Sequence, residues 1–138
     1  MTTNPFKYIT NIRFVDTDKY GHVNNSIYFN YFEEARTAWV YNSKQLISWA
    51  EQNSVQFVIS EQCCKYILPL LHPNKIQVTQ YIAKIGAASM EFEYEIRILG
   101  SDEVITRAKA KLACYNAKTG RLQKIPPQLK QLILEEND

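Results

Sequence analysis

The sequence has little of what membrane, secreted or nucleic-acid-binding proteins usually carry. No uninterrupted apolar run approaches the roughly 18 residues that a membrane-spanning helix needs. The first residues, Met1 to Lys7, lack the cationic start and apolar core of a secretory signal. The 16 basic and 14 acidic residues leave a net charge of only +2, which gives no support to a polyanionic partner. We therefore expect neither a membrane nor a nucleic acid among its partners.

Cysteine and histidine are also scarce. The three cysteines include an adjacent pair, Cys63 and Cys64, and make a poor disulfide framework. The two histidines, His22 and His72, do not have the spacing of zinc ligands. These absences predict a reduced, cytoplasmic protein without a metal or other cofactor.

What is present suits one globular domain. The chain has 138 residues, of which 46% are hydrophobic and 22% charged, close to the average of soluble domains. A chain of this length buries roughly two-thirds of its unfolded surface, which is enough for an independent core. We treat residues 1–138 as a single domain.

A long helix is predicted to begin near residue 26. Apolar side chains at helical spacing form one face over more than three turns: Ile27, Tyr28, Tyr31, Phe32, Ala35, Ala38 and Trp39. Asn24, Asn25 and Ser26 come just before them and are residue types that cap helix N-termini. We expect a helix about five turns long with one apolar face.

Two strands of alternating polarity, 90–98 and 106–114, are predicted to form a hairpin. If the turn at 99–103 pairs residue 99 with residue 103, acidic residues of the first strand face basic residues of the second. The pairs are Glu95 with Arg107, Glu93 with Lys109 and Glu91 with Lys111. Opposite charges across strands stabilise such a register. The basic stripe is therefore expected to be a charge-matched, solvated sheet face rather than a polyanion site.

Segments 7–15, 55–66 and 75–85 are predicted as further strands, and a short helix is expected after Pro126 and Pro127. The expected order is one strand, the long helix and then four strands in a meander. Both apolar faces are buried most economically in an α+β fold. We expect a five-stranded antiparallel sheet wrapped around one long central helix.

The segment that enters the helix, residues 14–25, has an unusual density of polar groups. It contains Asp16, Asp18, Gly21, His22, Asn24 and Asn25. Ordinary connections are short and carry only turn-forming residues. This one ends at a helix N-terminus, whose free N–H groups and positive dipole end favour developing negative charge. Asp18 beside such donors suggests acyl chemistry, in which it activates water or attacks a carbonyl carbon.

This segment resembles the loop of the hotdog-fold thioesterases of the 4-hydroxybenzoyl-CoA thioesterase type. The resemblance rests on Asp16-Thr17-Asp18, Gly21-His22-Val23-Asn24-Asn25, Tyr28 and Tyr31-Phe32-Glu33-Glu34-Ala35-Arg36, with weaker matches at Pro69-Leu70 and 85–89. It covers roughly residues 7–120, and the plant acyl-acyl-carrier-protein thioesterases have a similar loop. The resemblance implies the hotdog fold.

The same resemblance implies roles for individual residues. The second aspartate of the pair, the catalytic carboxylate of the family, corresponds to Asp18. A backbone N–H at the start of the central helix, on or near Asn25, would polarise the thioester carbonyl, and His22 occupies the place of a histidine in the plant-type site. The expected catalytic residues are Asp18, His22 and Asn25, and the expected substrate-binding residues are Tyr20, Gly21 and Asn24.

The implied reaction is hydrolysis of an acyl-CoA thioester to a free carboxylic acid and CoA, with Asp18 as general base or nucleophile. The implied assembly is a homodimer or homotetramer whose sheets join edge to edge, with active sites at the interface; a sheet edge left exposed in a single subunit also calls for pairing. Three alternatives stay open: an acyl-acyl-carrier-protein thioesterase, a non-catalytic acyl-thioester sensor, and a hydratase or dehydratase of acyl thioesters.

Other polar residues of the chain are expected to be structural. Asp16 would stabilise the loop by accepting backbone hydrogen bonds. Glu33, Glu34 and Arg36 are expected on a solvated or interface face of the helix. The adjacent cysteines are expected to be ordinary strand residues.

Overall fold

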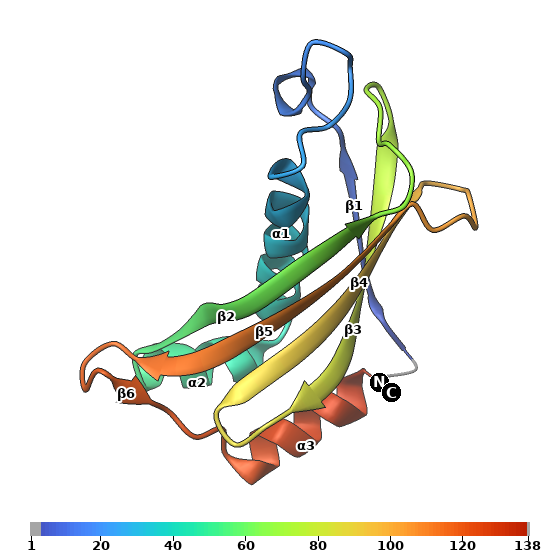
Figure 1. The fold of residues 1–138 in the computed structure, drawn as a ribbon. Coiled ribbons are helices and arrows are strands. Elements are labelled where there is room, and N and C mark those ends of the chain that lie inside the picture. Colours follow the sequence, from blue (N-terminus) through green and yellow to red (C-terminus); the bar gives the residue numbers. More distant parts are fainter. Residues whose placement is uncertain (1–3, 138) are drawn as a thin grey trace.

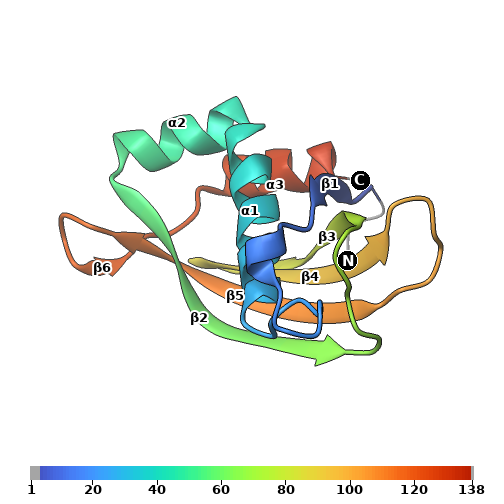
Figure 2. The same cartoon turned by 90° about the horizontal axis from the view of Figure 1, so that it is seen from above.

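The computed structural model describes residues 4–137. These residues form one antiparallel sheet with the helices on one side of it (Figures 1 and 2). In chain order the elements are β1 (Phe6–Asn11), the 3-10 helix η1 (Phe14–Asp16), α1 (Ile27–Tyr41), α2 (Lys44–Gln52), β2 (Val55–Tyr66), β3 (Lys75–Ile85), β4 (Ser89–Ile98), β5 (Thr106–Asn116), β6 (Arg121–Leu122) and α3 (Pro127–Glu136). No helix among these is long and apolar enough to cross a bilayer.

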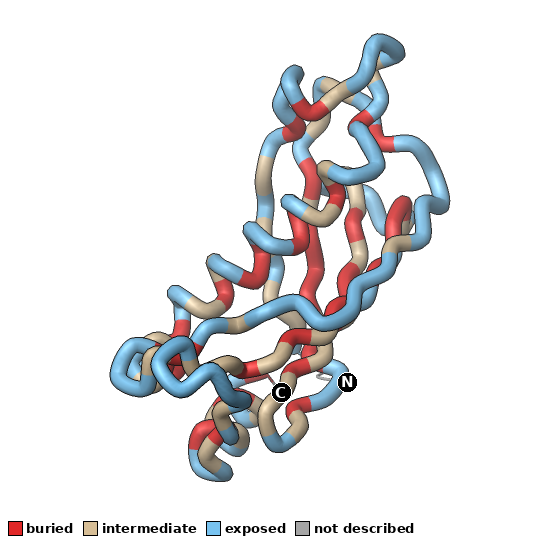
Figure 3. The backbone as a smooth tube through the Cα atoms, turned by 60° about the vertical axis from the view of Figure 1, so that its left-hand side comes forward, coloured by how far each residue is buried: buried red, intermediate tan, exposed pale blue. Residues whose placement is uncertain are grey.

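Helix α1 lies across the concave face of the curled sheet (Figure 2). Its apolar face is buried, as predicted, and the buried positions recur along the side turned to the strands (Figure 3). The Phe32 ring lies 4.9 Å from the Tyr94 ring, and the Trp39 ring lies 5.4 Å from the Phe92 ring, centroid to centroid. Burial of aromatic side chains of this size supplies much of the energy that holds α1 on the sheet.

The helix begins where the sequence predicts but is shorter than predicted. Its 15 residues make about four turns, and a second helix, α2, follows after a break at Asn42 and Ser43. The Ser43 side chain accepts a hydrogen bond from the Leu46 N–H and so caps α2. Helix α2 was not predicted from the sequence pattern.

The strand order is β1-β3-β4-β5-β2, with β6 paired to β5. The meander prediction is confirmed for β3, β4 and β5 but is wrong for β2, which pairs with β5 at the far edge of the sheet. The connection 67–74 runs from that edge to the start of β3, which is held to the end of β1 by the hydrogen bond from Ile12 N–H to the Asn74 carbonyl. The connection is therefore a crossover and not a hairpin turn.

The first strand also ends earlier than predicted. β1 stops at Asn11, and the chain then turns through η1. The turn is held by Asp16, which accepts hydrogen bonds from the backbone and side chain of Arg13. This local bonding takes residues 13–16 out of the sheet.

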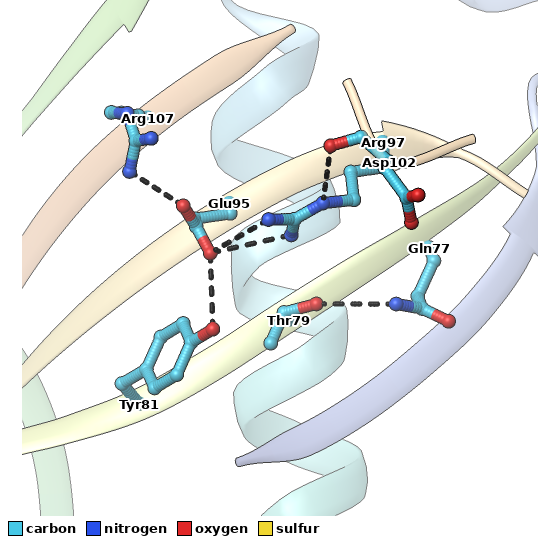
Figure 4. Close-up of polar contacts among 7 residues, drawn as sticks. All are labelled: Gln77, Thr79, Tyr81, Glu95, Arg97, Asp102 and Arg107. Atoms are coloured by element: carbon cyan, nitrogen blue, oxygen red, sulfur yellow. Dashed lines mark hydrogen bonds and ion pairs between the residues drawn. The ribbon is translucent and has the colours of Figure 1, made fainter. Parts of the chain in front are cut away.

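The predicted register of β4 and β5 is confirmed. Glu91, Glu93 and Glu95 lie opposite Lys111, Lys109 and Arg107, respectively. The second and third pairs form ion pairs, and Lys109 Nζ lies 3.8 Å from Glu93. Glu95 is shared: it pairs with Arg107 and Arg97 and accepts a hydrogen bond of 3.0 Å from the Tyr81 hydroxyl (Figure 4). The basic stripe is thus part of a charge-matched outer face, where each exposed pair contributes about 0–1 kcal/mol.

The C-terminal helix α3 follows Pro126 as predicted, with Leu129 and Ile133 buried. It lies on the same side of the sheet as α1 (Figure 2). The hydrogen bond from Asn4 N–H to the Asn137 carbonyl, 2.9 Å long, joins the two ends of the described chain.

Candidate active site

The loop that leads into α1 is anchored by Asp16. This carboxylate is 1% exposed and accepts hydrogen bonds from Arg13 Nη2 at 2.9 Å and from the Tyr31 hydroxyl at 2.9 Å. Burial acts to raise its pKa, but the hydrogen bonds from Arg13 and Tyr31 outweigh it and hold the pKa of Asp16 below its usual range. Asp16 therefore has the structural role that the sequence predicts. Its hydrogen-bond donors include the side chains of Arg13 and Tyr31 as well as the backbone N–H of Arg13.

Residues 17–23 form a narrow turn beyond this anchor. Thr17 and Val23 pair as an isolated bridge, and the Asp18 N–H donates to the His22 carbonyl at 2.8 Å. Gly21 has φ +79°, a conformation that residues with a Cβ rarely adopt. The turn brings Asp18 and His22 side by side, and the segment as a whole lies at the end of the molecule where α1 begins (Figure 1).

The Asp18 carboxylate is held by the backbone of its own turn. Its Oδ1 accepts hydrogen bonds from the Tyr20 N–H at 2.8 Å and from the His22 N–H at 3.2 Å. Within residues 4–137 its second oxygen accepts no hydrogen bond, and the residue is exposed. The side chain thus has a fixed orientation and one oxygen open to a ligand.

A second segment, the crossover 67–74, supports this turn, and no local sequence pattern indicates this role. The Val23 N–H donates to the Leu70 carbonyl at 2.8 Å, and the His72 N–H donates to the Gly21 carbonyl at 3.1 Å. Leu70 is buried, and its side chain belongs to the hydrophobic core, which anchors the crossover. The only sequence signal was the Pro69-Leu70 match to the thioesterase pattern, because this pairing joins residues some fifty positions apart in the chain.

The start of α1 is not capped by a side chain. Ser26, the N-cap residue, makes no capping hydrogen bond, and Asn24 uses its side-chain amide on the Asp16 carbonyl at 3.4 Å. The prediction that the asparagines and Ser26 cap the helix is therefore wrong. Among the described residues, the N–H groups of Asn25 and Ser26 have no acceptor. Such unpaired N–H groups at the positive end of a helix can stabilise an oxyanion.

Strand β2 contributes to this helix start through Tyr66. Its hydroxyl donates to the Asn25 carbonyl at 2.8 Å, and its ring packs edge-on against Tyr28 at 4.8 Å. Burial, together with neighbouring Cys64, raises the pKa of Tyr66 to about 12, so its hydroxyl stays protonated and able to donate at neutral pH.

The structure brings most of the predicted site residues together. Asp18, Tyr20, Gly21 and His22 share the tip of the turn, while Asn24 and Asn25 lie at the helix start. Two of these side chains have few contacts within the described residues. The His22 imidazole makes no hydrogen bond to any described residue, and Tyr20 is 71% exposed with its ring near Lys19 Nζ.

A cavity of about 430 Å³ opens farther along α1, between α1, α2 and strands β2, β4 and β5. Its walls are largely apolar and include Trp39, Phe57, Met90, Phe92 and Leu112. Arg36 also lines it and is only 7% exposed.

The sequence predicted that Glu33, Glu34 and Arg36 lie on a solvated or interface face of the helix. The prediction is right for Glu33 and Glu34, which are exposed, and wrong for Arg36, which is buried.

A curled antiparallel sheet around one central helix, with a carboxylate-bearing turn leading into that helix, defines the α+β hotdog class. The sequence places the chain within it: the profile of the Thioesterase-like superfamily matches residues 12–133, and the chain belongs to that family. The predicted fold and family are thus confirmed, and the membership supports hydrolase activity on thioesters.

The individual relatives share only about a quarter of their residues with this chain. The chain is 23% identical to the long-chain acyl-CoA thioesterase FadM of Escherichia coli, over 88% of this chain and 92% of FadM. It is 26% identical to a 1,4-dihydroxy-2-naphthoyl-CoA hydrolase of Nostoc punctiforme, over 93% of this chain and 86% of the hydrolase. The Staphylococcus aureus protein SAV2348, solved in complex with CoA, has a TM-score of 0.86 at 15% identity, covering 100% of this chain and 88% of its own. This last likeness shows the fold alone.

Proposed function

We propose that this protein hydrolyses acyl-CoA thioesters to a free carboxylic acid and CoA, with Asp18 as the reacting carboxylate. The observation that carries the proposal is the setting of Asp18. Two backbone N–H groups orient it, one of its oxygens is open, and it lies in the turn that leads to the unpaired N–H groups of Asn25 and Ser26. A carboxylate beside oxyanion donors is the combination that acyl transfer requires.

Two routes use this arrangement. As a general base, Asp18 takes a proton from water while the oxygen of that water attacks the thioester carbonyl carbon. As a nucleophile, the carboxylate attacks the carbonyl carbon itself and forms a mixed anhydride, which water then hydrolyses. In both routes the carbonyl oxygen gains negative charge that the helix-start N–H groups stabilise, and the C–S bond breaks to release CoA as thiolate.

The remaining site residues have supporting roles in the proposal. Gly21 allows the tight turn that presents the His22 N–H to Asp18. Tyr20 and His22 border the bound thioester, and Asn24 ties the helix start to the anchored Asp16 segment through its N–H at 3.0 Å. The apolar cavity along α1 would receive the acyl group.

The proposal includes a homodimer, which can associate further into a tetramer. Strand β2 is an edge strand of 12 residues, paired on one side only. Most of it is exposed, including the apolar side chains of Val58 and Ile59. A long exposed edge of this kind favours pairing with another chain, and a second copy paired there would border both the cavity and the Tyr66 side of the site.

The acyl-CoA substrate class is supported by the relatives, which are named for acyl-CoA and naphthoyl-CoA thioesters. The test is release of CoA from a panel of acyl-CoAs by the wild type and by Asp18→Asn. We expect the variant to keep its fold and to lose at least about a hundredfold in kcat, the usual size of a general-base contribution. Asp102→Asn is the matched control, since this exposed carboxylate lies in the β4–β5 connection, away from the site.

The readout must not depend on thiol reagents, because the chain has three free cysteines. Equal turnover by wild type and a well-folded Asp18→Asn variant would refute the assignment of Asp18. Ligand binding without turnover would indicate a sensor, and turnover only of carrier-protein thioesters would move the substrate class. Loss of an enoyl absorbance without thiol release would instead indicate a hydratase.

A further inference from the structure

The hairpin that joins β5 to β6 is rich in positive charge and has no acidic residue nearby in the sequence. Residues 104–134 contain no aspartate or glutamate but seven basic residues: Arg107, Lys109, Lys111, Lys118, Arg121, Lys124 and Lys130. The first three, on β5, face glutamates of β4. Of the other four, Lys118, Arg121 and Lys124 are exposed, and none of the four forms an ion pair with a carboxylate of residues 4–137. We call residues 116–124 the basic hairpin.

The basic hairpin has a shape fixed by its own hydrogen bonds. Asn116 Oδ1 accepts from the backbone N–H groups of Lys118 at 2.9 Å and Thr119 at 3.1 Å, and Asn116 Nδ2 donates to Gln123 Oε1 at 3.1 Å. Gly120, with φ +71°, donates its N–H to the Asn116 carbonyl at 2.9 Å. The backbone that presents the cations is therefore ordered before a partner binds, which reduces the entropy cost of binding.

The basic hairpin also exposes a large apolar side chain. Leu122, on β6 beside Arg121, is 66% exposed, although its backbone pairs with Tyr115. A phosphate group would need only the cations. An apolar residue bordered by cations instead suits a protein partner, because protein interfaces combine an apolar centre with a charged rim of complementary sign. The partner that fits is a small acidic protein with apolar side chains among its carboxylates.

Within one chain the basic hairpin is too far from Asp18 to act on the same substrate. β5 extends from Thr106, opposite Tyr66, to Asn116, opposite Val55, a length of roughly 33 Å. Tyr66 bonds to the helix start, so the candidate site and the hairpin lie at opposite ends of the sheet (Figure 1). A phosphopantetheine arm is shorter than this distance, so one chain cannot hold its carrier at the hairpin and react at its own Asp18.

A second copy removes this separation. In the proposed dimer the free edge of β2 pairs with its equivalent, and a two-fold axis makes the two β2 strands antiparallel. The Val55 end of one strand then lies toward the Tyr66 end of the other. Since Val55 pairs with Asn116 and Tyr66 bonds to Asn25, the basic hairpin of one copy lies at the same end of the joined sheet as the helix start of the other.

We propose that the basic hairpin of one copy docks an acidic acyl carrier protein, whose phosphopantetheine arm delivers the acyl thioester to Asp18 of the other copy. The inference rests on the proposed hydrolysis and the proposed dimer, and it adds a carrier protein to the substrates of the same site. The reaction is unchanged: water adds to the acyl carbon, the C–S bond breaks, and the arm leaves as the thiol while the acyl group leaves as the acid.

The test compares three thioesters of one acyl group, carried by an acidic acyl carrier protein, by CoA and by pantetheine. For the wild type we expect kcat/KM to be about tenfold or more higher for the carrier protein than for pantetheine. The value for the carrier protein should fall with added salt, whereas that for uncharged pantetheine should not. Calorimetry with the holo carrier protein, whose arm ends in a free thiol, measures docking without turnover.

Three variants locate the docking surface. The double variant Lys118→Gln/Arg121→Gln should lower kcat/KM for the carrier protein about tenfold, mainly through KM, and leave the pantetheine thioester unchanged. Leu122→Ser should lower kcat/KM for the carrier protein about three- to tenfold and leave acyl-CoA unchanged, because phosphate groups make no use of an apolar side chain. Lys7→Gln removes an exposed cation from β1, at the other edge of the sheet, and is the matched control.

A mixed dimer, purified through a different affinity tag on each copy, tests the placement across two copies. One copy carries Asp18→Asn and the other carries Lys118→Gln/Arg121→Gln. An intact Asp18 and an intact hairpin then meet only if one site takes them from different copies. We expect the mixed dimer to recover about half of the wild-type kcat/KM for the carrier-protein thioester, because one of its two symmetry-related sites is complete.

Each outcome bears on the inference. No measurable docking of the holo carrier protein, or equal kcat/KM for the carrier-protein and pantetheine thioesters, would overturn it. If Lys118→Gln/Arg121→Gln weakens acyl-CoA as much as the carrier protein and Leu122→Ser has no effect, the hairpin binds the phosphates of CoA and the carrier assignment is wrong. A mixed dimer as weak as the double variant would refute the placement across two copies. Failure to hydrolyse any thioester while the holo carrier protein still docks would refute the proposed function alone.

Discussion

The Tyr66 hydroxyl, near the end of edge strand β2, donates a 2.8 Å hydrogen bond to the backbone carbonyl of Asn25, just before helix α1 begins. This bond joins the exposed edge of the sheet to the peptide units at the helix start. The Asn25 carbonyl belongs to the peptide unit that carries the Ser26 N–H, one of the two unpaired donors of the candidate site. The orientation of that donor is thus set from another element.

Tyr66→Phe is expected to lower kcat by about three- to tenfold, which corresponds to the loss of one neutral hydrogen bond. The ring contact with Tyr28 survives in this variant, so the fold and KM should change little. Steady-state kinetics on the best acyl-CoA, with a thermal melt as the control for folding, measures both effects. A higher KM with unchanged kcat would show that Tyr66 binds substrate and does not position the donor.

Asp16→Asn is expected to destabilise the protein by about 1–3 kcal/mol at neutral pH, the cost of disrupting a buried hydrogen-bonded charge. Because the pKa of Asp16 is lowered in the folded protein, its contribution is fully present above the ordinary pKa of about 4 and is lost as the pH falls through the folded value. Urea unfolding from pH 7 to pH 3 should therefore show a smaller decrease in stability for the variant. Asp102→Asn, at an exposed site, should follow the wild type; a parallel decrease in Asp16→Asn would contradict the assignment.

Local sequence patterns predicted the features whose causes are local. The α1 face and the β4–β5 register follow from spacing and from cross-strand charges such as Glu95 with Arg107, and these interactions join residues close in the chain. The place of β2 did not follow. Its alternation and length are compatible with either neighbour, and its pairing with β5 depends on the crossover 67–74, which has no local signature.

The candidate site likewise has some features that local sequence predicted and others that depend on contacts distant in the chain. The turn around Asp18 was recognisable because its residues are consecutive, and their polar density has no ordinary structural explanation. The crossover that supports the turn at Leu70, and the burial of Arg36 against Tyr94, depend on long-range packing. A charged residue on a helix is usually solvated, so the sequence predicted a solvated or interface position for Arg36. In the fold this residue is buried.

Val58→Lys is expected to weaken self-association. Val58 is an exposed apolar residue on the free edge of the sheet, and lysine on an edge strand opposes pairing with another chain. Light scattering over a range of concentrations should give the mass of a dimer or a tetramer for the wild type and for Val58→Thr, which keeps the β-branched shape. The lysine variant should have a higher dissociation constant, so that it remains monomeric at concentrations at which the wild type is associated. A wild type that is monomeric throughout this range would refute the proposed dimer.

The three thiols should react with a soluble disulfide reagent in the order Cys63, Cys64, Cys114. Cys63 is exposed on β2, Cys64 is half-buried, and Cys114 is buried in β5. Burial raises the pKa of the Cys64 thiol, and it raises that of Cys114 to about 11, so both have little thiolate, the reacting form. Mass spectrometry of timed samples at pH 7 to 9 should show Cys114 modified only under unfolding conditions.

The same experiment on Val58→Lys adds a second readout: if β2 is covered by another copy, Cys63 should react faster in the variant than in the wild type. Rapid modification of Cys114 in the folded protein would contradict the burial of this residue in β5.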